Sequence, residues 1–405
     1  MQILLPLILL YYWACLYLQV LLPPPEESAW TYALLVTPIA LAASIGLLAN
    51  LARGRYSTAS DALAAPLLLL IAVATVVSAG RGDLASIRST GLMVLTLLWL
   101  GGTRPRLPLA TLNIYFLASI VVGGIWFLLG LSDYGLLPGQ YSEGADRGIE
   151  WRVSLFPFVP ESGFLALVVL LANQVHGRGW SRICVCTLAL YFVVFSGMRS
   201  ALVALLLCEI YVALNGKRCS TKARTAQLVF LIVTFAGAIV ASYAAPFLPT
   251  LPGGVIGNYL FRTETFGDSD AALSQTVYRA WLWLQHLELF LSSPLTGIGT
   301  FEFSSVVKES LIEGKDDSGS ESFITSWLAR LGLCFVPFLV YLWLLVRRAA
   351  VAVDNLKGTI VLTFGVASLA YGSFIVPYNF MFIILFCYLL QAVPRNFEPT
   401  RRTAL

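Results

Sequence analysis

The stretch from Thr359 to Pro394, TIVLTFGVASLAYGSFIVPYNFMFIILFCYLLQAVP, decides the fold class because it contains no Asp, Glu, Lys, Arg or His. A single membrane-spanning helix needs about 20 predominantly apolar residues. The stretch is longer than one such helix, and Pro377 interrupts it near the middle. It therefore predicts two consecutive spans, 359–377 and 378–394.

The rest of the 405-residue chain has the same apolar character. The residues AVILMFWYC make up 58% of it and charged residues only 12%, whereas about a quarter of a soluble domain is charged. This composition excludes a soluble enzyme and a nucleic-acid-binding chain. Apolar windows predict about twelve spans: 1–22, 30–52, 62–79, 89–103, 109–131, 153–174, 183–198, 200–214, 226–246, 323–346, 359–377 and 378–394. We expect an all-α integral membrane protein, with residues 1–405 forming one polytopic domain.

The distribution of charge predicts the orientation of these spans. If the N-terminus faces the cytoplasm, well over half of the 26 basic residues fall in inner segments, whereas most of the 22 acidic residues fall in outer ones. Such an excess of Lys and Arg marks the cytoplasmic side. We therefore expect an even number of spans with both termini in the cytoplasm. The first span has no basic residue before its apolar core, which favours a retained helix over a signal peptide.

One connection is far longer than the others. Residues 247–322 form a large loop on the outer face, and loops of this length are usually functional. Within it, residues 275–292 have helical periodicity and predict an amphipathic helix lying along the membrane surface. A Pro-Leu-Thr-Gly-Ile-Gly turn at residues 294–299 ends that helix.

A few ionisable residues fall where the membrane makes charge costly, and such groups are functional candidates. Arg199 lies between two apolar runs at the outer rim, where it either acts on a ligand or only anchors the interface. Glu161 lies near the outer end of the sixth span. For Arg330, pairing with a neighbouring span and catalysis are both open, and for Glu209 we expect a structural hydrogen bond.

Several common chemistries find no support in the sequence. The chain has no G-x-x-x-x-G-K-[ST] phosphate loop, and the Gly-Ile-Gly at residues 297–299 lacks the third glycine of a dinucleotide site. The expected topology puts His176 and His286 on opposite sides of the membrane, which excludes a paired-histidine metal site. The Asp-Ser-Asp at residues 268–270 imitates a nucleotide-sugar motif but faces outward, so we interpret it as a solvated turn. We expect neither a metal nor a cofactor.

Three short blocks, taken together, resemble the bacterial O-antigen polymerase and O-antigen ligase superfamily. Residues 196–202, SGMRSAL, resemble its S-G-S-R-T/S-A-L signature. Residues 278–301, from Tyr-Arg-Ala-Trp to Ser-Pro-Leu-Thr-Gly-Ile-Gly-Thr-Phe, are similar to its R-x-x-x-W-like helix followed by P-x-x-G-x-G. Residues 320–333, Ser-Glu-Ser-Phe-Ile followed by Leu-Ala-Arg-Leu-Gly-Leu, look like the family's approach to the next span.

The resemblance implies a membrane glycosyltransferase of C-type-like fold in the bacterial inner membrane, active at the periplasmic face. Its substrate would be an undecaprenyl-diphosphate-linked oligosaccharide, and its pathway lipopolysaccharide or surface polysaccharide biosynthesis. Its other partners would be the lipid bilayer and a candidate chain-length regulator protein, with no nucleic acid.

The residues point in the same direction, since guanidinium groups bind diphosphate through a rigid bidentate fork. We expect Arg199 and Arg279 to stabilise charge on the leaving diphosphate, with Arg262 as a third cation. Tyr278 and Trp281 could hold sugar rings, although interfacial aromatic belts explain many such residues.

The acceptor hydroxyl needs a base, for which Glu321 is the first candidate. His286 and Glu161 are the substitutes. Ligases of the superfamily typically carry a histidine where this chain has Ser-Glu-Ser at residues 320–322. We therefore favour a polymerase over a ligase, with a lipid-linked oligosaccharide flippase or other transporter as the remaining alternative.

Overall fold

The computed structural model describes residues 4–23, 28–52, 58–103, 107–142, 152–157, 159–215, 220–244, 285–299, 322–351, 355–370 and 379–391. In this part of the chain the regular structure is helical, and an isolated bridge between Tyr134 and Tyr141 is the one β-type pairing. The all-α fold class is thus confirmed for the described residues.

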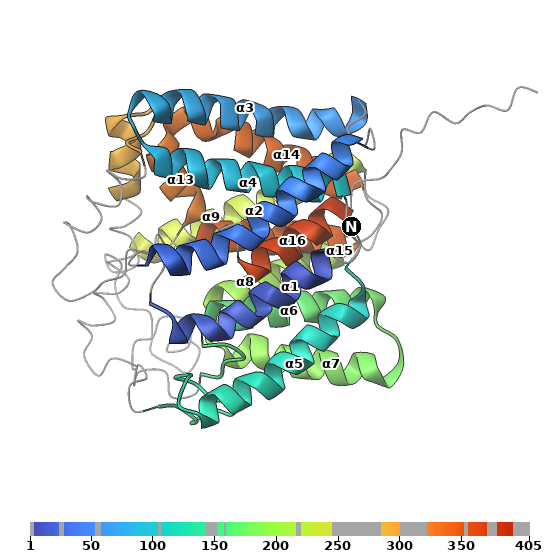
Figure 1. Cartoon of the computed structure of the whole chain (residues 1–405). Helices are drawn as coiled ribbons and strands as arrows, with labels where there is room; N and C mark the ends of the chain where they lie inside the picture. The colour runs from blue at the N-terminus through green and yellow to red at the C-terminus, as the bar shows by residue number, and fades with distance from the viewer. Residues whose placement is uncertain are drawn as a thin grey trace, which may run out of the picture.

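The helices run side by side in alternating directions, so that chain connections gather at the two ends of the bundle (Figure 1). Their bounds are α1 (Leu4–Leu18), η1 (Gln19–Leu21), α2 (Ala29–Ala52), α3 (Thr58–Gly80), α4 (Leu84–Thr103), α5 (Leu109–Leu128), α6 (Val159–His176), α7 (Gly179–Phe195), α8 (Arg199–Asn215), α9 (Thr221–Ala244), α13 (Phe323–Leu331), η4 (Gly332–Phe335), α14 (Val336–Val351), α15 (Asn355–Ala370) and α16 (Phe380–Gln391). We call the end that holds the α3–α4 turn and residues 285–299 the outer end, and the opposite end the inner end.

Many of these helices are apolar enough for a membrane. Six segments have the length and composition to cross one: Leu4–Leu21, Ala29–Ala52, Leu63–Gly80, Leu84–Thr103, Leu109–Leu128 and Phe323–Val351. Five shorter apolar helices accompany them: Glu161–His176, Gly179–Phe195, Ser200–Asn215, Asn355–Leu369 and Phe380–Leu390. Large apolar side chains such as Leu48, Val76 and Leu128 are exposed on the outside of the bundle. This is the surface of a multi-pass membrane protein, whose lipid-facing residues are as apolar as its core.

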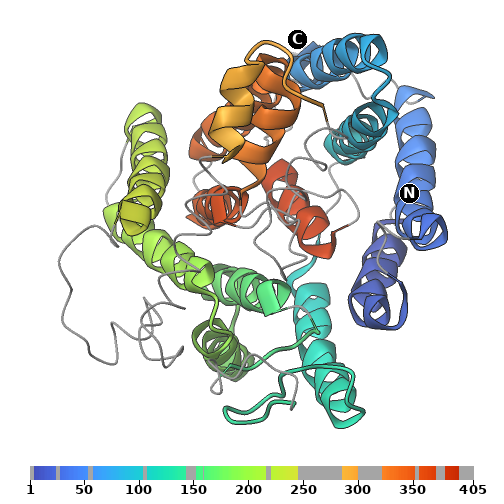
Figure 2. The same ribbon diagram turned by 90° about the vertical axis from the view of Figure 1, so that its left-hand side faces the viewer.

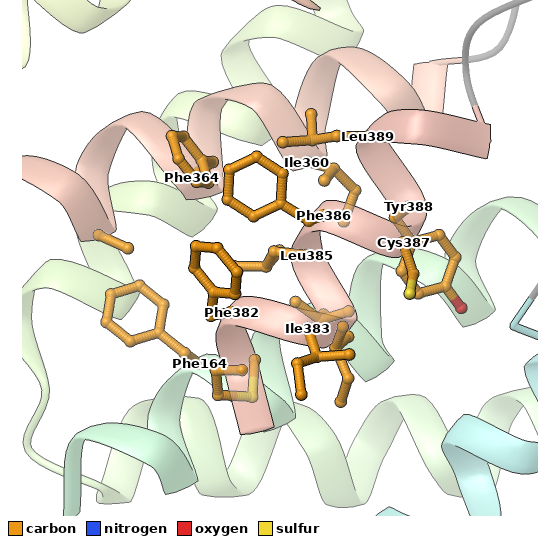
Figure 3. Packing of buried hydrophobic residues seen from close by; sticks show 14 of the residues in the cluster. Phe164, Ile360, Phe364, Phe382, Ile383, Leu385, Phe386, Cys387, Tyr388 and Leu389 are labelled. Carbon is orange, nitrogen blue, oxygen red and sulfur yellow. The ribbon is translucent and has the colours of Figure 1, made fainter. Parts of the chain in front are cut away.

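Two helices, α15 and α16, form the centre of the bundle, and α6 packs against them. Viewed end-on, α15 and α16 lie inside a ring made by the other helices (Figure 2). Almost every described side chain of α16 is buried, and α6 is buried nearly as completely. Aromatic rings fill the space between them, with the centroid of Phe386 5.0 Å from that of Phe364 and 4.5 Å from that of Phe382 (Figure 3). A helix that is apolar on all sides is buried in this way.

Several helices begin earlier than the sequence predicted. The third span was expected from residue 62 and starts at Thr58, the fourth starts at Leu84 instead of 89, and the ninth at Thr221 instead of 226. The prediction ends each of these spans at a charged residue, but a single charge does not interrupt the helical backbone. Arg88, for example, stays within α4 and places its guanidinium 4.2 Å from the centre of the Tyr32 ring.

The predicted sixth span, 153–174, is helical over only part of its length. Residues 153–157 are irregular and α6 begins at Val159. The irregular backbone is buried, and side chains satisfy it: the Tyr17 hydroxyl donates to the Leu155 carbonyl at 2.9 Å, and the Leu155 amide donates to the Ser162 hydroxyl at 2.8 Å. Non-helical backbone inside a bundle is tolerated where protein groups bond it.

The predicted tenth span, 323–346, is a broken helix and not a continuous one. Helix α13 ends at Leu331, and Gly332 adopts a left-handed φ of 59° before η4 and α14 continue the chain to Val351. Its ψ is −143°, and glycine adopts this combination of angles readily because it has no side chain to clash. The break is the position at which the outer segment docks, as described below.

Most of the predicted large loop, 247–322, lies outside the described residues. Within it the structure describes 285–299 and 322. Residues 285–292 are helical and residues 293–299 turn, which confirms the end of the predicted 275–292 helix. Its first part, 275–284, lies outside the described residues.

Candidate functional site

The turn at residues 293–299, which we call the outer turn, is bonded to the break between α13 and α14 through main-chain atoms. Three backbone hydrogen bonds join them: Ile298 N to Ala329 O at 3.0 Å, Gly299 N to Arg330 O at 3.0 Å, and Leu333 N to Pro294 O at 2.8 Å. The Cys334 thiol adds a contact of 3.2 Å to the Leu295 carbonyl. Two of the sequence blocks that carry the family resemblance thus pair with each other.

Two glycines make this close approach possible. A Cβ atom on Gly297 would lie 2.3 Å from the carbonyl oxygen of Arg330, and a Cβ on Gly332 would lie 2.5 Å from the carbonyl oxygen of Pro294. Both glycines also have left-handed φ angles, 64° and 59°, which other residues rarely adopt. The Gly-x-Gly of the turn and the glycine of the break are therefore a geometric requirement of the contact.

Arg81 also holds the outer turn in place, in addition to the main-chain bonds to the helix break. It lies in the short α3–α4 connection, and its guanidinium donates to the carbonyl oxygens of Thr296 and Gly297. It also donates to the hydroxyls of Thr296 and Ser293, the latter at 3.4 Å. Because a charged donor strengthens a hydrogen bond, Arg81 ties the outer turn firmly to the α3–α4 connection.

Asp83 brings an acidic group to the same place. The Asp83 carboxylate caps α4 by accepting from the Ser86 amide at 3.1 Å and from the Ser86 hydroxyl at 2.6 Å. Its Oδ2 atom would lie 2.8 Å from a Cβ on Gly299, so the backbone of the outer turn lies directly over it. Asp83 also interacts electrostatically with Arg330. The outer end therefore holds two arginines and one carboxylate around a backbone turn.

His286 is the contact between the outer helix and α13. Its side chain is 1% exposed, and its Nδ1 atom lies 2.9 Å from the Thr325 hydroxyl. Burial, together with the nearby positive charge of Arg330, lowers the pKa of His286 from 6.5 to about 4. The ring is therefore neutral at pH 7 and enclosed in protein, which suits an internal contact better than a base facing substrate.

Glu161 belongs to a second polar cluster, formed where α6, α8 and α16 begin. Its carboxylate is 4% exposed and lies 3.5 Å from the amide nitrogen of Asn379. Two residues further along α6, a Cβ on Gly163 would lie 3.0 Å from both the Ser196 hydroxyl and the Cβ of Met198. The Ser-Gly-Met-Arg block at the start of α8 thus packs against the first turns of α6.

The structure describes only some of the predicted site residues. Arg199 is the first residue of α8, but its side chain lies outside the described part. Five further predicted residues also lie outside the described residues: Arg262, Tyr278, Arg279, Trp281 and Glu321. Of the described ones, Arg330 and His286 come together beneath the outer turn. Glu209 accepts a hydrogen bond of 3.1 Å from Gln174, which confirms that the expected hydrogen bond is present.

Sequence reasoning missed Arg81, Asp83 and Asn379. The signal for the first two was a short connection, Arg-Gly-Asp at residues 81–83, that carries two charges between long apolar runs. No such signal marks Asn379, which accepts from the Met381 amide at 2.8 Å and so caps α16. Within the described residues no three His, Cys, Asp or Glu side chains gather in a way that could hold a metal ion.

Comparison of the chain with known protein families and curated proteins gives no match: no family model and no curated protein matches it. Its functional assignment rests on the residues themselves.

Proposed function

We propose that the chain is a membrane glycosyltransferase that joins undecaprenyl-diphosphate-linked oligosaccharide units into a surface polysaccharide, an O-antigen-type polymerase. The observation that carries the proposal is the pairing of the outer turn with the α13 break. Separate blocks with the superfamily's pattern, 294–299 and 329–333, meet through three main-chain hydrogen bonds. The glycines of both blocks are needed for that contact.

The charges near this contact support an anionic donor. Arg81 and Arg330 lie against the outer turn, and Arg199 begins α8 in the same bundle. In the proposal Arg199 and Arg279, with Arg262, bind the diphosphate and stabilise charge on it as the glycosidic bond to the leaving group breaks. Arg81 and Arg330 hold the outer segment that carries Arg279.

The position of Ser322 supports Glu321 as the base. The Ser322 hydroxyl accepts from the Thr325 amide at 3.4 Å, so Ser322 is the N-cap of α13 and Glu321 directly precedes it in the chain. In the proposal the Glu321 carboxylate accepts the proton of the acceptor sugar hydroxyl as that oxygen attacks the donor carbon. The diphosphate leaves with the bonding electrons.

The membrane arrangement in the proposal has twelve spans, counting α13, η4 and α14 as one. Both termini face the cytoplasm, the outer turn faces the periplasm, and the membrane is the bacterial inner membrane. The charge distribution supports this orientation, because the inner segments hold most Lys and Arg residues.

The packing of the central helices argues against a flippase. A flippase would present cations to a central cavity that opens to both sides in turn. In the described residues, the centre between α6, α15 and α16 is filled by the apolar side chains of Phe164, Phe364, Phe382 and Phe386 (Figure 3). The burial of His286 likewise argues against a ligase that would use this histidine to activate its acceptor.

The glycan ladder of cells that lack the protein tests the proposal. A polymerase defect leaves surface lipid with a single repeat unit, whereas a ligase defect leaves free core and a flippase defect strands repeats on the inner leaflet. Complementation with Arg279→Ala should fail while Arg279→Lys recovers little, since Lys lacks the bidentate fork. Lys222→Ala, which removes an exposed inner-end charge on α9, is the matched control and should restore the full ladder.

A further inference from the structure

A small cavity opens at the inner end of the bundle, remote from the outer turn. It has a volume of ≈ 110 Å³ and lies between α5, α6, α15 and α16. Its apolar walls include Leu107 beside α5 and Ile360 of α15, and its polar groups come from His176, Lys357 and Tyr388. Ile360 and Tyr388 lie beside the central aromatic cluster, with the Tyr388 hydroxyl directed away from it (Figure 3).

The polar groups of the cavity suit an anion. Lys357 lies in the first turn of α15, where the helix dipole also favours negative charge. His176 ends α6 and can donate from its ring, and Tyr388 supplies a phenolic donor. None of the described residues that line the cavity is acidic. Side chains that can donate hydrogen bonds therefore line this cavity from three helices, α6, α15 and α16.

The size of the cavity limits what the anion can be. A water molecule occupies about 30 Å³ of liquid, so ≈ 110 Å³ holds a group a few waters in size. A phosphate diester with its ester oxygens is of that order, whereas a sugar nucleotide is far larger. The apolar residues on the same walls suit the acyl chains that a lipid phosphate carries with it.

We propose that this cavity binds the phosphate of an anionic phospholipid headgroup at the inner membrane surface. Basic pockets between membrane helices on the cytoplasmic side are known to bind such headgroups. The inner end also carries basic residues at helix ends, among them Arg178 before α7 and Arg347 and Arg348 near the end of α14. The site is independent of the proposed polymerase activity, because it needs only insertion in a membrane.

The experiment uses the full-length protein purified in a neutral detergent. Native mass spectrometry and thermal unfolding are recorded with phosphatidylglycerol, with phosphatidylcholine and with inorganic phosphate. We expect phosphatidylglycerol to bind and to raise the unfolding temperature, and phosphatidylcholine to do so far less. A lysine near a membrane surface contributes about five-fold to the affinity for an anionic lipid, so Lys357→Ala should weaken binding by about that factor.

Two controls separate the site from general charge and from misfolding. Lys222→Ala removes the same charge from α9 at the inner end and should leave lipid affinity unchanged. Lys357→Arg keeps the charge and should retain binding, which distinguishes a lost ligand contact from a folding defect. Unchanged phosphatidylglycerol affinity in both Lys357→Ala and His176→Ala would overturn the proposal. Displacement of the lipid by millimolar inorganic phosphate would overturn the lipid as its source and identify a soluble phosphate site.

Discussion

Replacing Gly297 with alanine should detach the outer turn from α13. Gly297 has a φ of 64°, and an added Cβ would lie 2.3 Å from the carbonyl oxygen of Arg330. Alanine in the left-handed region costs about 1–2 kcal/mol. The collision adds to this cost because the nearest groups, the carbonyl of Arg330 and the amide nitrogen of Leu331, belong to the backbone and cannot rotate away. The turn therefore has to move, and the three main-chain hydrogen bonds to the α13 break are lost.

The magnitude of the effect follows from those bonds. Each contributes about 0.5–1.5 kcal/mol net, so their loss together amounts to about 1.5–4.5 kcal/mol beyond the strain of the φ angle. Such an energy raises the population of the detached turn by about ten-fold to a thousand-fold. Hydrogen–deuterium exchange in nanodiscs measures this population directly at the Ile298 and Gly299 amides, which are donors in two of the three bonds.

Gly130→Ala is the matched control for Gly297→Ala. Gly130 also has a left-handed φ, 72°, but an added Cβ there would meet no atom within 4 Å. It therefore carries the same strain without the collision, and the Ile298 and Gly299 amides should exchange as in the wild type. If Gly297→Ala leaves these amides as protected as Gly130→Ala does, the docking of the outer turn on α13 is wrong.

Four further predictions concern other positions. Arg81→Ala should speed exchange of the same turn amides and shorten the glycan ladder, because the charge-assisted bonds to the turn are lost; normal exchange would show that Arg81 is dispensable. Acidification from pH 6.5 towards 4 should loosen the contact between His286 and Thr325, since the folded pKa of His286, about 4, lies below its unfolded value of 6.5 and stability is lost as the ring must take up a proton. A His286→Gln variant should flatten that pH dependence of turn-amide exchange, and an unchanged pH profile would contradict the assignment. Glu321→Gln should reduce chain extension by about 10²- to 10⁴-fold with donor binding intact, the range for a general base, and more than about a tenth of wild-type activity would eliminate Glu321 as that base. An impermeant thiol reagent should leave Cys219 unlabelled in intact cells but label Ser318→Cys, and the reverse pattern would invert the orientation.

The helices themselves could be predicted because a helix that crosses a lipid bilayer needs a stretch of about 20 predominantly apolar residues. The uncharged stretch 359–394 predicted two spans. Helix α15 begins four residues before the first of them, at Asn355, and α16 lies within the second. What could not be predicted is which helices are central. An exposed residue of α2 such as Leu48 is as apolar as a buried residue of α16 such as Leu385, because lipid and protein interior have similar polarity.

The site could be predicted from the sequence only where the backbone conformation requires a particular residue type, such as glycine. Gly297 marked a turn, and the structure shows that the same glycine is needed for a close approach to α13. The contact between Gly297 and the helix break at Gly332 could not be predicted from the sequence. The main-chain hydrogen bonds that form it do not require particular side chains at Ala329 or Pro294. Arg81 was missed for a similar reason, since its acceptors are mostly backbone carbonyls of the outer turn.

The state of His286 narrows the choice of base in the proposed reaction. Its side chain is 1% exposed and its pKa is lowered to about 4, so it is a weak base in an enclosed position, which argues against it as the group that deprotonates the acceptor. Its interaction with Thr325 instead ties the outer helix to the first turn of α13, four residues after Glu321 in the chain. Moving the outer helix would therefore move the residue proposed as base. In the proposed reaction, therefore, His286 is a positioning residue for α13, and Glu321 is the group proposed to accept the proton.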